Sequence, residues 1–325
     1  MATMTAVVRE RYGSPDVLEL GEVDKPDVVD DGVLVRVRAT SVNRADWYTL
    51  MGTPYIARPM MGGLRKPKNK QLGTDFAGTV EAVGRDITGF QAGDEVFGGR
   101  TGAFAEFVCV RMGVAPKPAN LTFEEAAAVP VAGLTALQGL RDHGRLQSGQ
   151  HVLINGASGG VGTFAVQIAK ALGAEVTAVC STRNVELVRS LGADRVVDYT
   201  REDFTRSGRR YDVLLDVAGS KSWSQCRRVL NPRATLVIVG APKGGGLMGP
   251  LGHIAKVRLA AFRGSQRAVF FVAKFNKADM GVLRELLESG KVKPVVERRY
   301  ELGETADALR YMGEGHVQGK LVITV

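Results

Sequence analysis

The chain has 325 residues, which is enough for two domains with sizeable cores, and its 45% hydrophobic and 24% charged residues are ordinary for a soluble globular protein. No apolar stretch approaches the length of a membrane span, and the N-terminus lacks the basic-then-apolar layout of a signal peptide. Three scattered cysteines, Cys109, Cys180 and Cys226, give neither a disulfide framework nor a zinc-ribbon spacing, so we expect a cytoplasmic protein.

The region from Ala6 to about Leu121 is predicted to be rich in β-strands. Residues 33–38 alternate as a strand with one solvent-facing side does, and residues 73–83 and 94–97 are further candidates, separated by glycines. Regular helix is nearly absent before Phe123 in this pattern. It therefore predicts a compact, antiparallel, barrel-like domain.

The net charge of +9 has one local source in the basic loop from Arg65 to Lys70. Such a loop can contact nucleic acid or an anionic membrane. No aromatic residues interleave with its charges for base stacking, and no amphipathic apolar face accompanies them. We therefore expect a solvated loop and no nucleic-acid partner, and part of the excess charge can assist a polyanionic cofactor.

Thr122 with Glu125 forms a capping-box signal for a following helix. The most informative stretch comes next, where the apolar strand 151–155 runs into the glycine-rich turn 156–162. Its small residues Ala157, Gly159 and Gly162 let the backbone turn tightly, approach a pyrophosphate and pack helix on strand. The turn resembles a dinucleotide fingerprint with alanine at the first special position.

The residues after the turn complete a βαβ unit. Apolar residues recur at helical spacing up to Leu172, Gly173 caps the helix, and an apolar strand, Glu175–Cys180, follows. Later strands are predicted at 195–197, 211–217, 234–240 and about 268–272, with helices between most of them. Six strands of this kind form a doubly wound parallel sheet. We expect a glycine-rich loop at 241–250, a helix at 277–289 and a last strand at 320–325 that rejoins the first domain.

The same turn also spells G-x-S-x-G, the nucleophile elbow of serine hydrolases, with Ser158 as the nucleophile. Asp216 and His253 follow in the order that such a triad needs. That alternative explains neither Gly162 nor the large N-terminal region, so we favour a nicotinamide cofactor.

The end of the second strand of the βαβ unit favours NADPH over NADH. An NAD site places an acidic side chain there, whereas this chain has Ser181, Thr182, Arg183 and Asn184. A serine hydroxyl and a guanidinium can hold a ribose 2′-phosphate through charge-assisted hydrogen bonds. Tyr199, after the third strand, is a further candidate donor to that phosphate.

These motifs together resemble a known family. The chain is similar to the zinc-independent medium-chain dehydrogenases/reductases of the quinone oxidoreductase (zeta-crystallin-like) group. The motifs that carry the resemblance lie at residues 41–46, 73–84, 90–98, 131–136, 156–162 and 316–324. They cover essentially the whole chain and are specific for the superfamily but not for a substrate.

The resemblance implies a GroES-like domain at 1–121, a Rossmann NADPH-binding domain at 122–272 and a return segment at 273–325 that completes the first domain, as well as a homodimer. Zinc-dependent relatives have a cysteine ligand near Asn43 and a histidine–glutamate pair after Gly73, where this chain has Thr74 and Asp75. Its four histidines are dispersed, so a catalytic zinc site lacks ligands and we expect no metal.

Hydride addition without a metal requires an acceptor that is already electrophilic, such as a quinone or an α,β-unsaturated carbonyl. Charge added to such an acceptor delocalises onto oxygen, which hydrogen-bond donors can stabilise. By resemblance, Asn43 lies beside the nicotinamide and the substrate oxygen, and Tyr48 can donate a hydrogen bond or a proton. The alternatives are a turn-forming asparagine and an aromatic wall residue beside Trp47. We leave Asp46 out of the catalytic set.

Further cofactor contacts follow by position. The glycine turn supplies contacts at Ala157, Ser158, Gly159, Gly160 and Val161. The resemblance adds Asn43, Thr135, Val217, Ala218, Val239, Gly240, Phe271, Val272 and Lys320.

The leading hypothesis is an NADPH-dependent reductase of quinones or activated alkenes. An enoyl reductase of acyl thioesters is a close alternative, and a non-catalytic NADPH-binding sensor or partner-binding protein is an alternative from another class. The acceptor itself depends on loops near 55–70 and 241–262 that sequence patterns do not place, and neither one- nor two-electron reduction is favoured.

Overall fold

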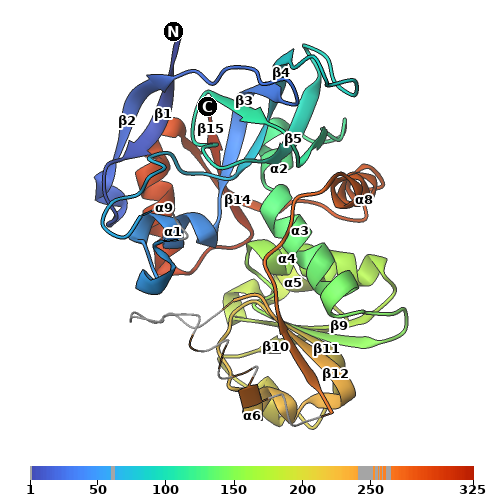
Figure 1. Cartoon of the computed structure of the whole chain (residues 1–325). Helices are drawn as coiled ribbons and strands as arrows, with labels where there is room; N and C mark the ends of the chain where they lie inside the picture. Colours follow the sequence, from blue (N-terminus) through green and yellow to red (C-terminus); the bar gives the residue numbers. More distant parts are fainter. Residues whose placement is uncertain are drawn as a thin grey trace. The chain divides into compact units, whose positions relative to one another are not determined.

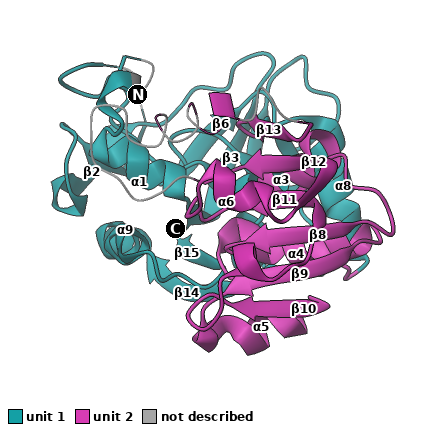
Figure 2. Ribbon diagram, turned by 90° about the horizontal axis from the view of Figure 1, so that it is seen from below, with its two compact units in different colours: residues 1–134, 274–289, 294–325 teal, residues 135–273, 290–293 magenta. Residues whose placement is uncertain are grey.

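The computed structural model describes residues 2–59, 63–240 and 265–325, together with a few positions between 252 and 260. The chain divides into two compact units (Figure 2). Unit 1 comprises residues 1–134, 274–289 and 294–325, and unit 2 comprises residues 135–273 and 290–293. The glycine turn therefore lies in unit 2, while Asn43, Tyr48 and Lys320 lie in unit 1.

Unit 2 is built around a six-stranded parallel sheet (Figure 1). The strand order is β10-β9-β8-β11-β12-β13, so the order reverses between β8 and β11. The strands are β8 (His151–Asn155), β9 (Glu175–Cys180), β10 (Arg195–Asp198), β11 (Tyr211–Asp216), β12 (Leu230–Ile238) and β13 (Arg267–Phe270), and the helices are α4 (Gly160–Ala171), α5 (Val185–Ser190) and α6 (Trp223–Arg227). The predicted doubly wound fold is confirmed.

The sequence located most of these elements closely. β8 and β9 have the predicted bounds, and α5 begins at Val185, after a short 3-10 turn at Thr182–Asn184. β12 begins at Leu230, four residues before the predicted start, and its first part contains Pro232 and Arg233, whose φ of 67° interrupts a regular strand pattern. The loop predicted at 241–250 lies outside the described residues.

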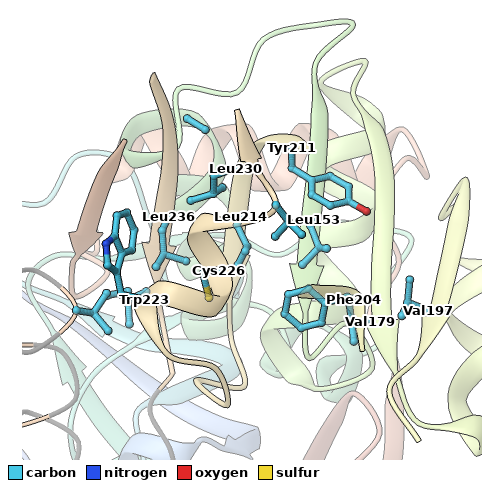
Figure 3. Packing of buried hydrophobic residues seen from close by; sticks show 14 residues of the cluster. Leu153, Val179, Val197, Phe204, Tyr211, Leu214, Trp223, Cys226, Leu230 and Leu236 are labelled. Carbon is cyan, nitrogen blue, oxygen red and sulfur yellow. The ribbon is translucent and has the colours of Figure 1, made fainter. Parts of the chain in front are cut away.

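One face of the sheet in unit 2 packs into an apolar cluster (Figure 3). Leu153, Val179, Leu214 and Leu236 come from four neighbouring strands. Trp223 and Cys226 of α6 belong to the same cluster, as does Phe204 before β11. Because each fully buried side chain of this kind stabilises the fold by about 1.5–3 kcal/mol, the cluster is a substantial part of what holds α6 against the sheet.

Unit 1 contains a seven-stranded sheet and a two-stranded one. In the larger sheet the order is β14-β15-β3-β4-β5-β7, and β6 also pairs with β3. The strands of unit 1 are β1 (Thr3–Arg9), β2 (Leu18–Asp24), β3 (Val33–Val42), β4 (Asp75–Val83), β5 (Glu95–Gly99), β6 (Phe107–Val110), β7 (Val114–Pro116), β14 (Val296–Glu301) and β15 (Lys320–Thr324). β15 pairs antiparallel with β3, so the last strand rejoins the N-terminal region as predicted.

The expectation that helix is nearly absent before Phe123 is wrong at one place. α1 (Arg44–Met51) follows β3 directly. Asn43 is its N-cap residue, and the Asp46 carboxylate accepts a hydrogen bond from the Asn43 backbone N–H at 2.7 Å. This pairing is a capping box with aspartate at the third helical position, a local signal that the strand pattern around it obscures.

The other helices of unit 1 lie later in the chain. They are α2 (Phe123–Ala127), α8 (Lys277–Glu288) and α9 (Thr305–Glu314), together with the first part of α3 (Pro130–Gln138). α3 crosses into unit 2 at Thr135 and runs on into a π-helical turn at Gly139–His143. The predicted capping box of α2 is present, with Thr122 and Glu125 bonded to each other's backbone N–H. No helix in the described ranges is both long and apolar enough to cross a membrane.

Candidate functional site

The glycine turn of unit 2 lies at the start of helix α4, where the first backbone N–H groups have no acceptor within the helix. Gly159 is the N-cap of α4 and has no side chain to accept from the first helical turn. The first N–H groups of a helix have no intrahelical acceptor and attract anions. A Cβ at Gly162 would lie 2.1 Å from the Gly156 carbonyl oxygen, so only glycine lets α4 start this close to the turn. The arrangement fits a pyrophosphate.

The parallel topology places most of the predicted cofactor residues at one edge of the sheet. Apart from Thr135, which is half-buried on α3, each of those in unit 2 follows the carboxyl end of a strand. They are Ala157, Ser158, Gly159, Gly160 and Val161 after β8; Ser181, Arg183 and Asn184 after β9; Tyr199 after β10; Val217 and Ala218 after β11; Val239 and Gly240 after β12; and Phe271 and Val272 after β13. This edge is where ligands bind in open α/β sheets.

Asn184 links two parts of that edge. Its Nδ2 donates to the Ser158 hydroxyl at 2.8 Å and to the Ser181 hydroxyl at 3.2 Å, and the residue is only 4% exposed. The side chains of Arg183 and Tyr199 are exposed beside it. The arrangement offers a guanidinium, two hydroxyls and a phenol to a ligand, as a phosphate requires.

Sequence reasoning missed one acidic residue in this neighbourhood. Asp198 ends β10, directly beside Cys180 of β9 in the strand register. Its carboxylate accepts from the hydroxyls of Thr182 at 2.6 Å and Thr200 at 2.8 Å, and these bonds, Thr182 first, lower its pKa. The signal was available as an acidic residue at the end of the third strand. Through the bond to Thr182, Asp198 connects the end of β10 to the segment that follows β9.

The residues of the hydrolase alternative do not come together in the described part of the chain. The Ser158 hydroxyl has an amide partner, Asn184, which cannot act as a base. The Asp216 carboxylate accepts from Asn155 Nδ2 and from the Gly219 N–H, each at 2.8 Å. Burial raises the pKa of Asp216 to about 6. His253 lies outside the described residues.

In unit 1, the predicted catalytic residue Asn43 stands at the end of the central strand β3. β4 and β15 flank this strand on its two sides. Ser41 of β3 faces Asp75 of β4, and Val42 faces Leu321 of β15. The registers therefore bring Asp75 and Lys320 to the same end of β3 as Asn43, from segments that are far apart in the chain.

The three side chains form a buried hydrogen-bonded cluster. Asn43 Nδ2 donates to Asp75 Oδ2 at 2.8 Å, and Lys320 Nζ donates to Asn43 Oδ1 at 2.6 Å and to Asp75 Oδ2 at 3.2 Å. The Ser41 hydroxyl and the Val131 N–H also donate to the Asp75 carboxylate, both at 2.8 Å. Asp75 is 0% exposed, Lys320 2% and Asn43 7%. A carboxylate and an ammonium so deeply buried are stable only as a pair with further hydrogen bonds.

Asp46, which is not among the predicted catalytic residues, belongs to the same region. It is 3% exposed, and besides the Asn43 N–H its carboxylate accepts from the Thr74 hydroxyl at 3.4 Å. Burial raises its pKa to about 7, and the nearby Asp75 adds to the increase, against the effect of the Asn43 hydrogen bond. This carboxyl group therefore titrates near neutral pH beside Asn43.

Tyr48 is half-buried on α1, five residues after Asn43. The Arg44 guanidinium lies 6.0 Å from the centre of its ring. Its neighbour Trp47 packs against α9, where a Cβ at Gly313 would come within 2.4 Å of the indole. Near the C-terminal end of α1, the buried Arg9 donates to the Thr49 carbonyl. The helix that carries Tyr48 is thus held in its middle and near its C-terminal end.

Two family models match this chain. A family model described as an alcohol dehydrogenase GroES-like domain matches residues 29–134, and one described as a zinc-binding dehydrogenase matches residues 191–323. Among the described residues, no group of three or more His, Cys, Asp or Glu side chains could hold a metal ion.

Curated relatives match nearly the whole chain. A mitochondrial NAD(P)H oxidoreductase of Mus musculus is 35% identical over 99% of this chain and 89% of its own length. A 2-methylene-furan-3-one reductase of Solanum lycopersicum is 34% identical (96% and 76%), and a chloroplastic quinone oxidoreductase of Triphysaria versicolor is 32% identical (98% and 98%).

Solved structures agree with these relatives. The quinone oxidoreductase of Coxiella burnetii has a TM-score of 0.87 at 30% identity, covering 100% of both chains. The Escherichia coli quinone oxidoreductase complexed with NADPH has a TM-score of 0.82 at 25% identity, covering 99% of this chain and 100% of that one.

A GroES-like unit with a Rossmann unit defines the class of medium-chain dehydrogenases/reductases, enzymes that carry out oxidoreduction with a nicotinamide cofactor. Within that class, the chain belongs to the zeta-crystallin-like quinone oxidoreductase family.

Proposed function

We propose that this oxidoreductase uses NADPH to reduce quinones or α,β-unsaturated carbonyls, without a metal ion. The single observation that carries the choice of NADPH is the end of β9, where Ser181 and Arg183 stand in place of an acidic residue. The acceptor class rests on relatives named as reductases of quinones and of an unsaturated furanone. The absence of a metal rests on Asn43, Thr74 and Asp75 standing where zinc-dependent relatives place ligands.

The α4 N-terminus would hold the pyrophosphate, and the residues after β9 and β10 the 2′-phosphate. NADPH, when bound, supplies the hydride. The chain's own residues orient the acceptor and stabilise the charge that develops on its oxygen. Asn43 contributes an amide N–H for that purpose, and Tyr48 contributes a hydroxyl that can donate a proton.

The preference for NADPH is tested by Arg183→Ala. A charged hydrogen bond to phosphate contributes about 1.5–3 kcal/mol, so the affinity for NADPH should fall by about tenfold to a hundredfold while the affinity for NADH hardly changes. Titration calorimetry with both dinucleotides measures the two affinities. Arg189→Ala is a matched control, because this exposed arginine pairs with Glu186 on α5. Equal losses for NADPH and NADH in Arg183→Ala contradict the proposal.

The acceptor class is tested by steady-state oxidation of NADPH with an o-quinone, a simple enone and a crotonyl thioester. Turnover of the quinone or the enone supports the proposal. Preference for the thioester identifies an enoyl reductase, and tight binding of NADPH with no turnover identifies a non-catalytic protein. Light scattering on the same preparation tests separately whether the protein is the homodimer that the family resemblance implies.

A further inference from the structure

The cluster of Asn43, Asp75 and Lys320 at the end of β3 contains two charged side chains, although an asparagine can donate a hydrogen bond without them. Asn43 alone could offer an amide N–H, yet it lies against a carboxylate and an ammonium that are both almost completely buried. Burying two ions costs free energy that their mutual attraction only partly returns. The presence of a buried ion pair beside Asn43 therefore needs an explanation other than its contribution to stability.

The reason for the buried pair lies in the similar shape of the two ends of the asparagine side-chain amide. An amide presents an oxygen and a nitrogen of similar size, so packing alone does not decide which of them faces which neighbour. A carboxylate can only accept hydrogen bonds and an ammonium can only donate them. With Asp75 on one side and Lys320 on the other, only one orientation satisfies both neighbours, with Nδ2 toward Asp75 and Oδ1 toward Lys320.

We propose that the buried pair of Asp75 and Lys320 is a positioning device that fixes the side-chain amide of Asn43 for hydride transfer. Asp75 uses one hydrogen of Asn43 Nδ2, and the second has no acceptor among the described residues. That second N–H therefore points in one fixed direction and is the group available to an acceptor oxygen or to the nicotinamide. Lys320, by bonding to the amide oxygen, also polarises the amide and makes this N–H a stronger donor.

Asp75 is the centre of this device because its two oxygens serve different elements. Oδ2 accepts from Asn43, Ser41 and Lys320, while Oδ1 accepts from the Val131 N–H in the first turn of α3. α3 also carries Thr135, a predicted nicotinamide contact. One carboxylate thus fixes the catalytic amide and the start of a second helix that we expect at the cofactor. This inference rests on the proposed function, since it assigns the device to hydride transfer.

The decisive variant removes both charges together. Loss of one partner would leave the other charge uncompensated and destabilise the fold. The double variant Asp75→Asn with Lys320→Gln leaves two neutral amides of similar size, each of which can donate or accept, so nothing fixes the Asn43 amide. We expect its kcat to fall by about 10–100-fold, as for a misplaced catalytic group, with a melting curve that still shows one cooperative transition.

A double-mutant cycle with Asn43→Ala separates positioning from other roles. If the pair acts through Asn43, adding the two substitutions to Asn43→Ala should change kcat by less than about threefold. If the two substitutions lower kcat by the same factor in Asn43→Ala as in the wild type, the proposal is overturned, because the pair then acts independently of the amide. Lys170→Met, which breaks the half-exposed pair with Asp194, is the control and should leave kcat unchanged.

A readout without turnover distinguishes this proposal from the proposed function. In protein labelled with 15N at asparagine side chains, the Asn43 amide signals are identified by their absence in Asn43→Ala. Exchange of the hydrogen bonded to Asp75 should be slow in the wild type and at least about tenfold faster in the double variant, as expected when a neutral amide that can turn over replaces its charged acceptor. An unprotected amide in the wild type, or an unchanged kcat in the double variant, overturns the positioning role alone. A protected amide in a wild type that reduces no acceptor overturns the proposed function and this inference with it.

Discussion

Each unit buries a carboxylate where strands of its sheet end, but the two units surround it differently. Asp75 in unit 1 has the Lys320 ammonium 3.2 Å away, together with neutral donors. Asp216 in unit 2 has neutral donors among the described residues, from Asn155 and Gly219, and burial raises its pKa to about 6. Asp75 is therefore half of a buried ion pair, whereas Asp216 is buried without a cationic partner among the described residues and has a raised pKa.

The difference matches what each unit is expected to do. A dinucleotide is large and carries its own charges, so backbone N–H groups and small residues at the α4 N-terminus suffice to receive it. A single amide that must aim one N–H at a small acceptor needs neighbours that determine its orientation. Substitutions should accordingly act through electrostatics in unit 1 and through close approach of the backbone in unit 2.

The largest effect is expected from removing the carboxylate in unit 1. Asp75→Ala leaves the Lys320 ammonium buried without a counter-charge and should lower the free energy of unfolding by about 3–5 kcal/mol. Urea unfolding at neutral pH measures the change. Lys170→Met, at a half-exposed pair, should cost less than about 1 kcal/mol. A loss in Asp75→Ala no larger than in this control would contradict a buried ion pair.

A smaller effect is expected at the glycine turn of unit 2. Alanine at Gly162 places a Cβ 2.1 Å from the Gly156 carbonyl oxygen, so Gly162→Ala should destabilise the cofactor-free protein by about 1–3 kcal/mol.

Gly159→Ala is the matched control for this close approach. Its Cβ would meet only the Gly156 oxygen, at 3.7 Å, and the stability of the cofactor-free protein should fall by less than about 1 kcal/mol. Both variants should bind NADPH more weakly in calorimetry. Equal stability losses at the two glycines would show that close approach of the backbone does not distinguish them.

The dependence of stability on pH should separate the two units. Folding raises the pKa of Asp46 to about 7 and that of Asp216 to about 6, so the folded state holds both protons more tightly than the unfolded state. The free energy of unfolding should therefore fall as pH rises above the unfolded pKa of about 4, by about 1 kcal/mol per pH unit for each group. Above pH 6 the loss of stability that comes from Asp216 is complete, and only the loss that comes from Asp46 continues, to about pH 7.

Urea unfolding of Asp46→Asn and Asp216→Asn at a series of pH values checks this expectation. Asp216→Asn should flatten only the lower part of the curve, and Asp46→Asn should also flatten the part between pH 6 and 7. A wild-type stability that rises over this range would show that the carboxyl groups are not buried as described.

The smallest expected effect is a difference in chemical reactivity between the three cysteine thiols. Burial raises the pKa of Cys226 to about 12 and that of Cys180 to about 11, both in unit 2, whereas Cys109 in unit 1 is half-buried. Because the thiolate is the reactive form, a disulfide reagent should modify Cys109 well before the other two in the native protein. Mass spectrometry of tryptic peptides identifies the modified residue, and early labelling of Cys180 or Cys226 would indicate local opening of unit 2.

Much of unit 2 was predictable because its signals are local. The strand at 151–155, the glycine turn and the strand at 175–180 succeed each other within thirty residues, and each position needs a distinctive residue type. Parallel topology then follows from the alternation of strands and helices. The polar residues at the strand ends could be named for the same reason, since every parallel strand brings its carboxyl end to one edge. Asp198 stands at such a strand end as well, but its bond to Thr182 depends on the pairing of β10 with β9, which the local pattern around Asp198 does not specify.

The site in unit 1 was only partly predictable. Asn43 and Lys320 were named through the family resemblance, but as separate contacts of substrate and cofactor, and Asp75 was considered only as a position without a zinc ligand. The amino-acid sequence by itself determined the family, the dinucleotide turn and the succession of strands and helices along the chain, because these depend on neighbouring residues. Only the tertiary structure decided that Lys320 meets Asp75 and Asn43, which are 245 and 277 positions away in the chain. Such a pairing depends on the register of β3 with both β4 and β15, and no local pattern of residues specifies a register across that distance.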